Sequence, residues 1–167
     1  MPRLSLAGLA LVVAVLLGAC SDDDAASPPT EPGAAGSVCQ QLDPIDLRRA
    51  TGRYFDDAVA DGTTCTYSSS ESAAVVGLSV TSLDGVPADD ALALLRESCD
   101  PATAVDLAVT TAERAFGCTV QGAATVAAAG GDHLAVLAGV TLAAPAPARS
   151  QLDALGRLAE RALRPPP

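Results

Sequence analysis

The chain has 167 residues, of which 49% are apolar, and it carries 20 acidic side chains against 10 basic ones. This length suits one globular domain with a short appendage. The net charge of −10 argues against binding to nucleic acid or to an anionic lipid surface, because both require clustered cations. Two Tyr, two Phe and no Trp are present, so a stacking platform for bases or sugars is not expected.

The N-terminal residues 1–19 have the features of a secretory signal peptide. One cation, Arg3, precedes the apolar run Leu9–Leu17, and small residues follow this run up to Ala19. A transmembrane helix is the alternative, but it needs about 20 apolar residues, and a run of three Asp begins soon after Cys20. We therefore expect residues 1–19 to direct export and then to be removed.

The segment Leu17-Gly18-Ala19-Cys20 resembles a bacterial lipobox. In lipobox proteins a diacylglyceryl group is attached to the cysteine thiol, and a signal peptidase then cleaves the chain directly before this cysteine. We therefore expect cleavage between Ala19 and Cys20, and lipidation of Cys20. Two acyl chains anchor a protein stably, so the predicted location is the outer leaflet of the cell membrane, facing the cell wall and the extracytoplasmic space.

Residues 20–37 follow the predicted cleavage site and contain three Asp, three Pro and two Gly, with no apolar periodicity. Such a composition buries too little apolar surface to offset the entropy of the chain, so it predicts a flexible tether behind Cys20. A calcium site at Asp22–Asp24 is the alternative, but the ligand spacing of calcium loops is missing. The expected boundaries are a signal peptide (1–19), a tether (20–37), one domain (38–164) and a tail (165–167).

The cysteines that remain for the domain are Cys39, Cys65, Cys99 and Cys118. An even number of cysteines in an exported chain predicts disulfides. Three pairings are possible, and we favour Cys39 with Cys65 and Cys99 with Cys118, because each pair would join a helix end to a strand that follows it. The spacing contains no Cys-x-x-Cys and the chain has one histidine, so no metal site, redox motif or cofactor is expected.

The domain alternates signals for helices and strands, beginning with a helix that Asp43 and Pro44 open and Gly52 ends. Two more helices are predicted, one from Pro87 to near Cys99 and one over Ala148–Leu163. The apolar stripe of the helix that begins at Pro87 consists of Ala91, Leu92, Leu94 and Leu95. The predicted strands are Thr63–Ser69, Ala74–Leu83, Val105–Thr111, Phe116–Gln121, Ala124–Ala129 and Leu134–Leu142.

This order of elements, α-β-β-α-β-β-β-β-α, predicts a fold of the α+β class. Consecutive strands that are joined by short turns favour a mainly antiparallel sheet of about six strands, with about three helices packed on one of its faces. A single domain of this length buries enough apolar surface to fold alone.

The start of the domain contains Cys39-Gln-Gln-Leu42, Asp46-Leu47 and Ala50-Thr-Gly52, followed by Cys65-Thr-Tyr67. This segment is similar to a family of actinobacterial lipoproteins known as domain of unknown function 3558. Members of this family join a lipobox to a cysteine before the first helix, a glycine after it and a Cys-x-aromatic strand. Their aromatic residue is more often Trp, and their Asp-Pro usually precedes the first cysteine. The resemblance implies an exported lipoprotein with disulfides and an α+β fold, and it implies no activity.

The best enzymatic candidate is Asp132-His133, with a Ser or Thr as the nucleophile. Adjacent side chains of a strand point to opposite faces, so Asp132 is poorly placed to orient His133 as a triad requires. A pair of carboxylates is a second catalytic candidate, but glycan sites usually add aromatic stacking. Asp56, Asp57 and Asp61 form an acidic group that we interpret as a solvated loop, with contact to a ligand or a cation as the alternative.

Three arginines, Arg157, Arg161 and Arg164, lie at helical spacing near the end of the chain. They suit an anionic polymer or partner, although the helix dipole alone also favours cations at this end. The sequence favours a non-catalytic, lipid-anchored envelope module that binds or senses an envelope protein or a small ligand, and it assigns no catalytic residue. The alternative is a small envelope hydrolase that uses His133 or an acidic pair.

Overall fold

The computed structural model describes residues 38–140 and 148–164 of the chain. In chain order, the elements are α2 (Pro44–Thr51), β1 (Asp57–Asp61), β2 (Thr64–Ser68), β3 (Val75–Ser82), α3 (Ala88–Arg96), β4 (Val105–Asp106), β5 (Arg114–Val120), β6 (Ala123–Gly130), β7 (His133–Val140) and α4 (Ala148–Ala162). The fold therefore belongs to the predicted α+β class. None of the helices in the described ranges is long and apolar enough to cross a membrane.

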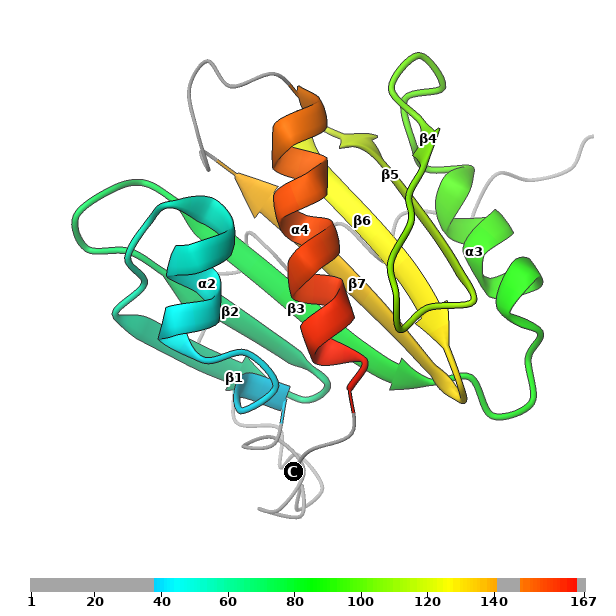
Figure 1. Cartoon of the computed structure of the whole chain (residues 1–167), viewed down its shortest axis with the longest axis horizontal. Helices are drawn as coiled ribbons and strands as arrows, with labels where there is room; N and C mark the ends of the chain where they lie inside the picture. Colours follow the sequence, from blue (N-terminus) through cyan, green and yellow to red (C-terminus); the bar gives the residue numbers. More distant parts are fainter. Residues whose placement is uncertain (1–37, 141–147, 165–167) are drawn as a thin grey trace, which may run out of the picture. The chain divides into compact units, whose positions relative to one another are not determined.

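The strands form one 7-stranded antiparallel sheet with the order β1-β2-β3-β7-β6-β5-β4 (Figure 1). At its centre β3 pairs with β7, from Val75 opposite Val140 to Ser82 opposite His133. After β3 the chain passes through α3 to the far edge of the sheet and then returns strand by strand. The last strand, β7, therefore lies beside β3 and joins the two halves of the sheet.

Helices α2 and α4 cover one face of the sheet (Figure 1). α4 buries Leu152, Leu155, Leu158 and Ala162 against this face, and α2 buries Leu47. These residues of α4 recur at helical spacing, so one stripe of the helix enters the core. With the strand residues beneath them they form a cluster of 19 buried residues among those described, which we call the α4 cluster.

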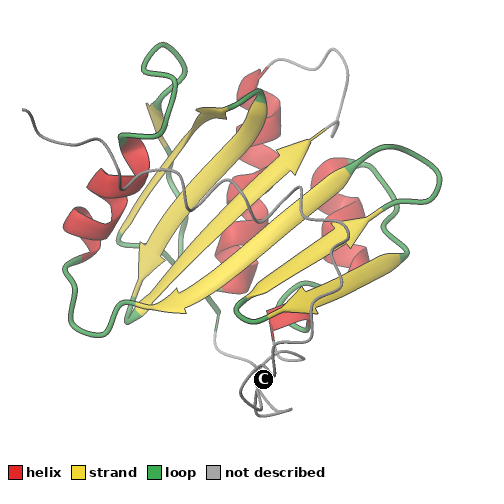
Figure 2. Ribbon diagram, turned by 180° about the vertical axis from the view of Figure 1, so that it is seen from behind, coloured by secondary structure: helices red, strands yellow, loops and turns green. Residues whose placement is uncertain are grey.

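Helix α3 lies on the opposite face of the sheet (Figure 2), so the prediction that all helices share one face is wrong. In β6, Val126 and Ala128 belong to the α4 cluster, whereas Ala127 and Ala129 belong to a second cluster beneath α3. Successive side chains of a strand point to opposite faces, which places the two helices on opposite sides. This α3 cluster consists of Leu83, Leu92, Cys99, Phe116, Cys118, Ala127 and Ala129.

The predicted apolar stripe of α3 is buried at one position. Leu92 is buried, whereas Leu94 is 70% exposed, and Ala91 and Leu95 are partly buried against the α3 cluster. The helix ends at Arg96 and does not continue to Cys99. The four apolar residues of this stripe therefore overstate how much of α3 is buried in the core, since one of them is buried.

The first predicted helix is confirmed with its end signals. The Asp43 side chain accepts a hydrogen bond from the backbone N–H of Asp46 at 2.7 Å, and Pro44 occupies the first turn. Gly52 ends α2 with a φ of 72°, a left-handed conformation that glycine adopts without steric cost.

The described part of the chain contains one strand more than the six predicted, namely β1. It lies where a loop was predicted at Asp56, Asp57 and Asp61, so that prediction is wrong for Asp57–Asp61. β1 pairs with β2 from Asp57 opposite Ser68 to Asp61 opposite Thr64. β1 is a mostly exposed edge strand with an acidic residue at each end, and its residues do not alternate between apolar and polar. The turn of this hairpin consists of Gly62 and Thr63, because Asp61 pairs with Thr64. Glycine at the first turn position is typical of tight hairpins, and Gly62 has a φ of 56°.

The strand predicted over Val105–Thr111 is limited to Val105–Asp106. Its apolar residues continue into the connection to β5, where the backbone N–H of Ala112 donates to the carbonyl of Val109 and closes a turn. Apolar residues therefore extend beyond the strand because the connection itself packs on the domain. β7 is confirmed up to Val140, and the predicted end of that strand, residues 141–142, lies outside the described residues.

Candidate functional site

The four domain cysteines form the two favoured disulfides, Cys39–Cys65 and Cys99–Cys118. Cys39 precedes α2 and Cys65 lies in β2, whereas Cys99 follows α3 and Cys118 lies in β5. Each disulfide thus joins the region of a helix end to a strand, as predicted. The predicted cleavage and lipidation positions, Ala19 and Cys20, lie outside the described residues, as do the predicted tether and tail.

Tyr67 supports the first disulfide. Its hydroxyl donates to the backbone carbonyl of Cys39 at 3.1 Å, and its side chain is buried next to Cys65 in the α4 cluster. Burial raises the pKa of Tyr67 to about 12, partly offset by a hydrogen bond with the backbone of Leu42. This residue is the aromatic member of the Cys-x-aromatic pattern, and here it secures the chain that leads into α2.

His133, the histidine of the hydrolase alternative, lies at the start of β7 opposite Ser82. The hydroxyl of Ser82 donates to Asp84 at 2.7 Å, so its proton is directed to a carboxylate and away from the imidazole. Asp132 contributes its backbone carbonyl, which accepts from the N–H of Leu83. His133 and Arg164 also line a small cavity of about 310 Å³. The described residues thus bring Ser, His and Asp near one strand end without a Ser–His–Asp chain of hydrogen bonds.

The structure places Asp61 at the far end of β1 from the neighbouring residues Asp56 and Asp57. Asp56 accepts hydrogen bonds from the hydroxyl and the backbone N–H of Ser70. Both bonds hold the pKa of Asp56 below its usual value, and the bond from the hydroxyl has the larger effect. Asp57 and Asp61 lie at the two ends of β1. No group of three or more His, Cys, Asp or Glu within the described ranges is placed to hold a metal ion.

Two of the three C-terminal arginines connect α4 to α2. Arg157 donates to the carbonyl of Ala50 at 3.0 Å, and Arg161 donates to Asp46 at 2.9 Å. Arg164, two residues beyond the end of α4, pairs with Glu160 of that helix at 2.7 Å. These arginines therefore hold the two helices of one sheet face together and stabilise the last turns of α4.

A cleft of about 670 Å³ lies where α3 meets the β4–β5 edge of the sheet. Leu92 and Phe116 lie on the apolar part of its wall, and both are buried members of the α3 cluster. The volume is within the range of ordinary ligand pockets. Five ionisable side chains also line it: Asp89, Arg96, Asp106, Glu113 and Arg114.

One wall of the cleft is the connection between β4 and β5, which several backbone contacts hold in place. The N–H of Glu113 donates to Ala129 at 2.8 Å, and the hydroxyl of Thr111 donates to Glu160 of α4 at 3.0 Å. Gly130 permits this approach, because a Cβ at this position would lie 2.3 Å from the carbonyl oxygen of Thr111. The wall is therefore fixed on two sides by β6 and α4.

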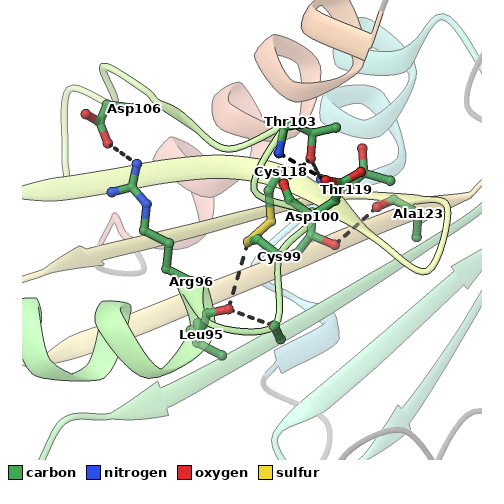
Figure 3. Close-up of a disulfide and its surroundings, with 12 residues drawn as sticks. Leu95, Arg96, Cys99, Asp100, Thr103, Asp106, Cys118, Thr119 and Ala123 are labelled. Atoms are coloured by element: carbon green, nitrogen blue, oxygen red, sulfur yellow. Dashed lines mark hydrogen bonds and ion pairs between the residues drawn. A yellow bond between two sulfur atoms is a disulfide. The ribbon is translucent and has the colours of Figure 1, made fainter.

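The other wall is α3, which a disulfide, ion pairs and a cation–π contact attach to the sheet edge. Figure 3 shows the disulfide and the ion pair of Arg96 with Asp106. The disulfide Cys99–Cys118 follows the C-terminal end of the helix. Arg96 pairs with Asp106 of β4 at 2.9 Å, and its guanidinium lies 5.4 Å from the centre of the Phe116 ring. A second ion pair joins Arg114 of β5 to Asp89 at 3.3 Å. Both ion pairs thus cross the cleft.

The charges of the cleft nearly balance, with three carboxylates and two guanidiniums in the lining. Both pairs are exposed, since the side chains of Arg96 and Asp106 are 47% and 82% accessible, and those of Arg114 and Asp89 are 68% and 74% accessible. The described lining contains no His or Cys. This arrangement suits the binding of charged groups on an apolar base.

No motif in the sequence predicts this cleft. Its charged residues come from α3, from β4, from the connection before β5 and from the start of β5, and no spacing in the chain connects them. Only the topology, which carries the chain from α3 to the far edge of the sheet, brings them together.

Comparisons with known proteins identify no relative: no family model matches the chain, and no match is found among curated proteins or solved structures.

Proposed function

We propose that this protein is a lipid-anchored domain of the cell envelope that acts by binding and not by catalysis. The observation that carries the proposal is the distribution of its cysteines. Four of them are paired in two disulfides, which form and persist outside the reducing cytoplasm. The fifth, Cys20, follows an apolar segment in a lipobox-like sequence and is the natural lipid acceptor. The resemblance to the actinobacterial lipoprotein family points in the same direction.

Binding is favoured over hydrolysis by the two cavities. The larger cleft combines an apolar wall with opposite charges and has the volume of a ligand site. His133, which lines the smaller cavity, is paired across the strands with Ser82. The Ser82 hydroxyl donates to Asp84, so this serine and the imidazole are not coupled as nucleophile and general base. The ligand on this proposal is a small molecule or an exposed segment of an envelope protein.

The anchor is tested by producing the whole precursor with Cys20→Ser in a bacterium that lipidates proteins. We expect the wild-type protein to partition into the detergent phase of a Triton X-114 extract and to carry the mass of a diacylglyceryl group. The Cys20→Ser protein should remain uncleaved or lack this mass. The control is Cys99→Ser with Cys118→Ser, which removes two other cysteines and their disulfide and should keep the lipid. Equal mass and partitioning of wild type and Cys20→Ser would refute the anchor.

The absence of His-dependent catalysis is tested with the purified protein and isolated cell-wall material. We expect no release of soluble fragments above that of buffer, and no difference between wild type and His133→Ala. A hydrolase activity that His133→Ala abolishes, while the far-UV circular dichroism and the unfolding transition are preserved, would show that the binding proposal is wrong.

A further inference from the structure

The geometry points to a small zwitterionic ligand, a peptide of a few residues with free amino and carboxyl ends, in the cleft between α3 and the β4–β5 edge. This inference rests on the proposed binding function and specifies the chemistry of its ligand. It is carried by the two ion pairs that cross the cleft above buried apolar side chains.

Both ion pairs are weak enough to be replaced. Asp106 is 82% exposed and Asp89 is 74% exposed, and exposed pairs of this kind contribute little net stability because water and salt screen them. Arg96 is better held than its partner, since its guanidinium also lies against the Phe116 ring. A ligand carboxylate can therefore take the place of Asp106 on a guanidinium that is already oriented.

The charge balance selects a ligand with both signs. A carboxylate that displaces Asp106 from Arg96 leaves the aspartate without its cation, and an ammonium group on the same ligand restores that partner. Glu113 adds a further carboxylate to the same lining. A bound ligand covers the opened pair and excludes water from it, so a ligand with one charge leaves one covered member without a partner. A neutral apolar ligand covers both pairs without replacing their hydrogen bonds, which is costly for the same reason.

The cleft keeps its shape while a pair opens. The disulfide Cys99–Cys118 holds the chain beyond α3 to β5, and Leu92 anchors the helix in the α3 cluster. The opposite wall is fixed by the Thr111 and Glu113 contacts. When Arg96 leaves Asp106 and pairs with a ligand, the side chains of these two residues move and the backbone around them stays in place.

The experiment uses the lipidated full-length protein in detergent and the tripeptide Ala-Leu-Ala as the probe, with isothermal titration calorimetry as the measurement. We expect saturable binding with one site per chain. Two blocked forms of the same peptide, N-acetylated and C-amidated, should each bind about tenfold more weakly, because each lacks one charged hydrogen-bonding end. Sodium acetate and ethylamine, which carry one charge each, should not bind detectably.

Two variants locate the site. Arg96→Gln should weaken the binding of Ala-Leu-Ala about tenfold and should abolish the difference between the free and the C-amidated peptide. Glu113→Gln should reduce the difference between the free and the N-acetylated peptide. The controls are Arg149→Gln, which breaks an exposed pair with Asp153 on α4, and Glu71→Gln, which removes an exposed carboxylate outside the cleft lining. Both controls should bind the peptide as the wild type does.

Absence of binding by Ala-Leu-Ala, or equal binding by its free and C-amidated forms, would overturn the inference, the second result indicating a site for cations alone. Equal weakening by Arg96→Gln and Arg149→Gln would also overturn it. None of these results touches the anchor, which is judged by the mass and partitioning of Cys20→Ser. A failure of the ligand class is thus distinguishable from a failure of the proposed function.

Discussion

The two faces of the sheet differ in how their helices are held. α4 lies over the larger cluster, buries a full stripe of side chains and is joined to α2 by Arg157 and Arg161. α3 buries one leucine and depends on a disulfide and two exposed ion pairs. Apolar packing thus fixes one face, and a covalent bond beside the helix secures the other. This difference matters because the lightly packed helix, α3, forms one wall of the candidate cleft.

The largest effect should distinguish Leu155 from Leu92. Leu155→Ala removes a completely buried side chain from the middle of α4, and we expect a loss of about 3–5 kcal/mol in the free energy of unfolding. Leu92→Ala, in the smaller cluster, should cost about 2 kcal/mol, because the exposed side of α3 allows the site to collapse. Urea denaturation followed by circular dichroism measures both values, and equal losses would contradict the comparison.

The disulfides should have nearly equal effects on global stability and different local effects. Their sequence separations are 26 and 19 residues, so chain entropy gives about 3 kcal/mol for each. Cys99→Ala with Cys118→Ala should also accelerate hydrogen exchange of the α3 amides above the global rate, because little else holds the helix.

The matched variant for this comparison is Cys39→Ala with Cys65→Ala, which should leave α3 exchange at the global rate. Uniform acceleration in both variants would show that α3 is not a separately opening unit. Non-reducing peptide mapping of Cys39→Ser should in addition find a free thiol at Cys65 and an intact Cys99–Cys118 bond.

A smaller effect concerns how the free energy of unfolding depends on pH through Tyr67 of the α4 cluster. Because the folded state raises the pKa of Tyr67 from 10.0 to about 12, its contribution to stability is fully present below pH 10. It declines as the pH rises toward 12, since the unfolded chain then releases the phenolic proton more readily. Tyr67→Phe should cost about 1 kcal/mol at pH 8, through loss of the bond to Cys39, and should flatten this decline.

Urea midpoints measured between pH 8 and pH 11 test this dependence. The control is Tyr54→Phe, which alters an exposed tyrosine and should leave both the stability and its pH dependence unchanged. A decline of the same slope in Tyr67→Phe and in the wild type would assign the effect to another group.

The smallest effect is expected for the ion pairs of the cleft. Arg96→Gln and Arg114→Gln should each change the free energy of unfolding by less than about 1 kcal/mol, as expected for exposed pairs. The difference between wild type and variants should shrink further in 1 M NaCl. A loss above 2 kcal/mol for either variant would show that the pairs are structural and would remove the basis for their exchange with a ligand.

The sequence predicted the elements whose signals are local. Asp43, Pro44 and Gly52 mark both ends of α2, and β3 and β7 alternate along their length. The disulfide pairing also followed from the order of elements, because each cysteine pair joins the chain next to a helix to a strand that comes soon after it. In each case the decisive residues lie within about 30 positions of one another.

The errors concern long-range arrangement. β1 was missed because its two ends are acidic and its pairing uses one neighbour only. The side on which α3 packs depends on the burial of both faces of β6, where alanines alternate between two clusters. The cleft depends on the meeting of α3, β4 and β5, which follows from the path of the chain around the sheet and leaves no motif in the sequence.

The edges of the sheet have a consequence for how two copies of this domain meet. An edge strand presents unpaired backbone groups that invite a neighbouring copy to add its own strand and so to start aggregation. Here one edge, β4, has two residues, and the other, β1, carries Asp57 and Asp61 at its ends. Two such β1 edges repel each other when they approach, which disfavours strand pairing between copies of the kind that the proposed lipid anchor would hold side by side.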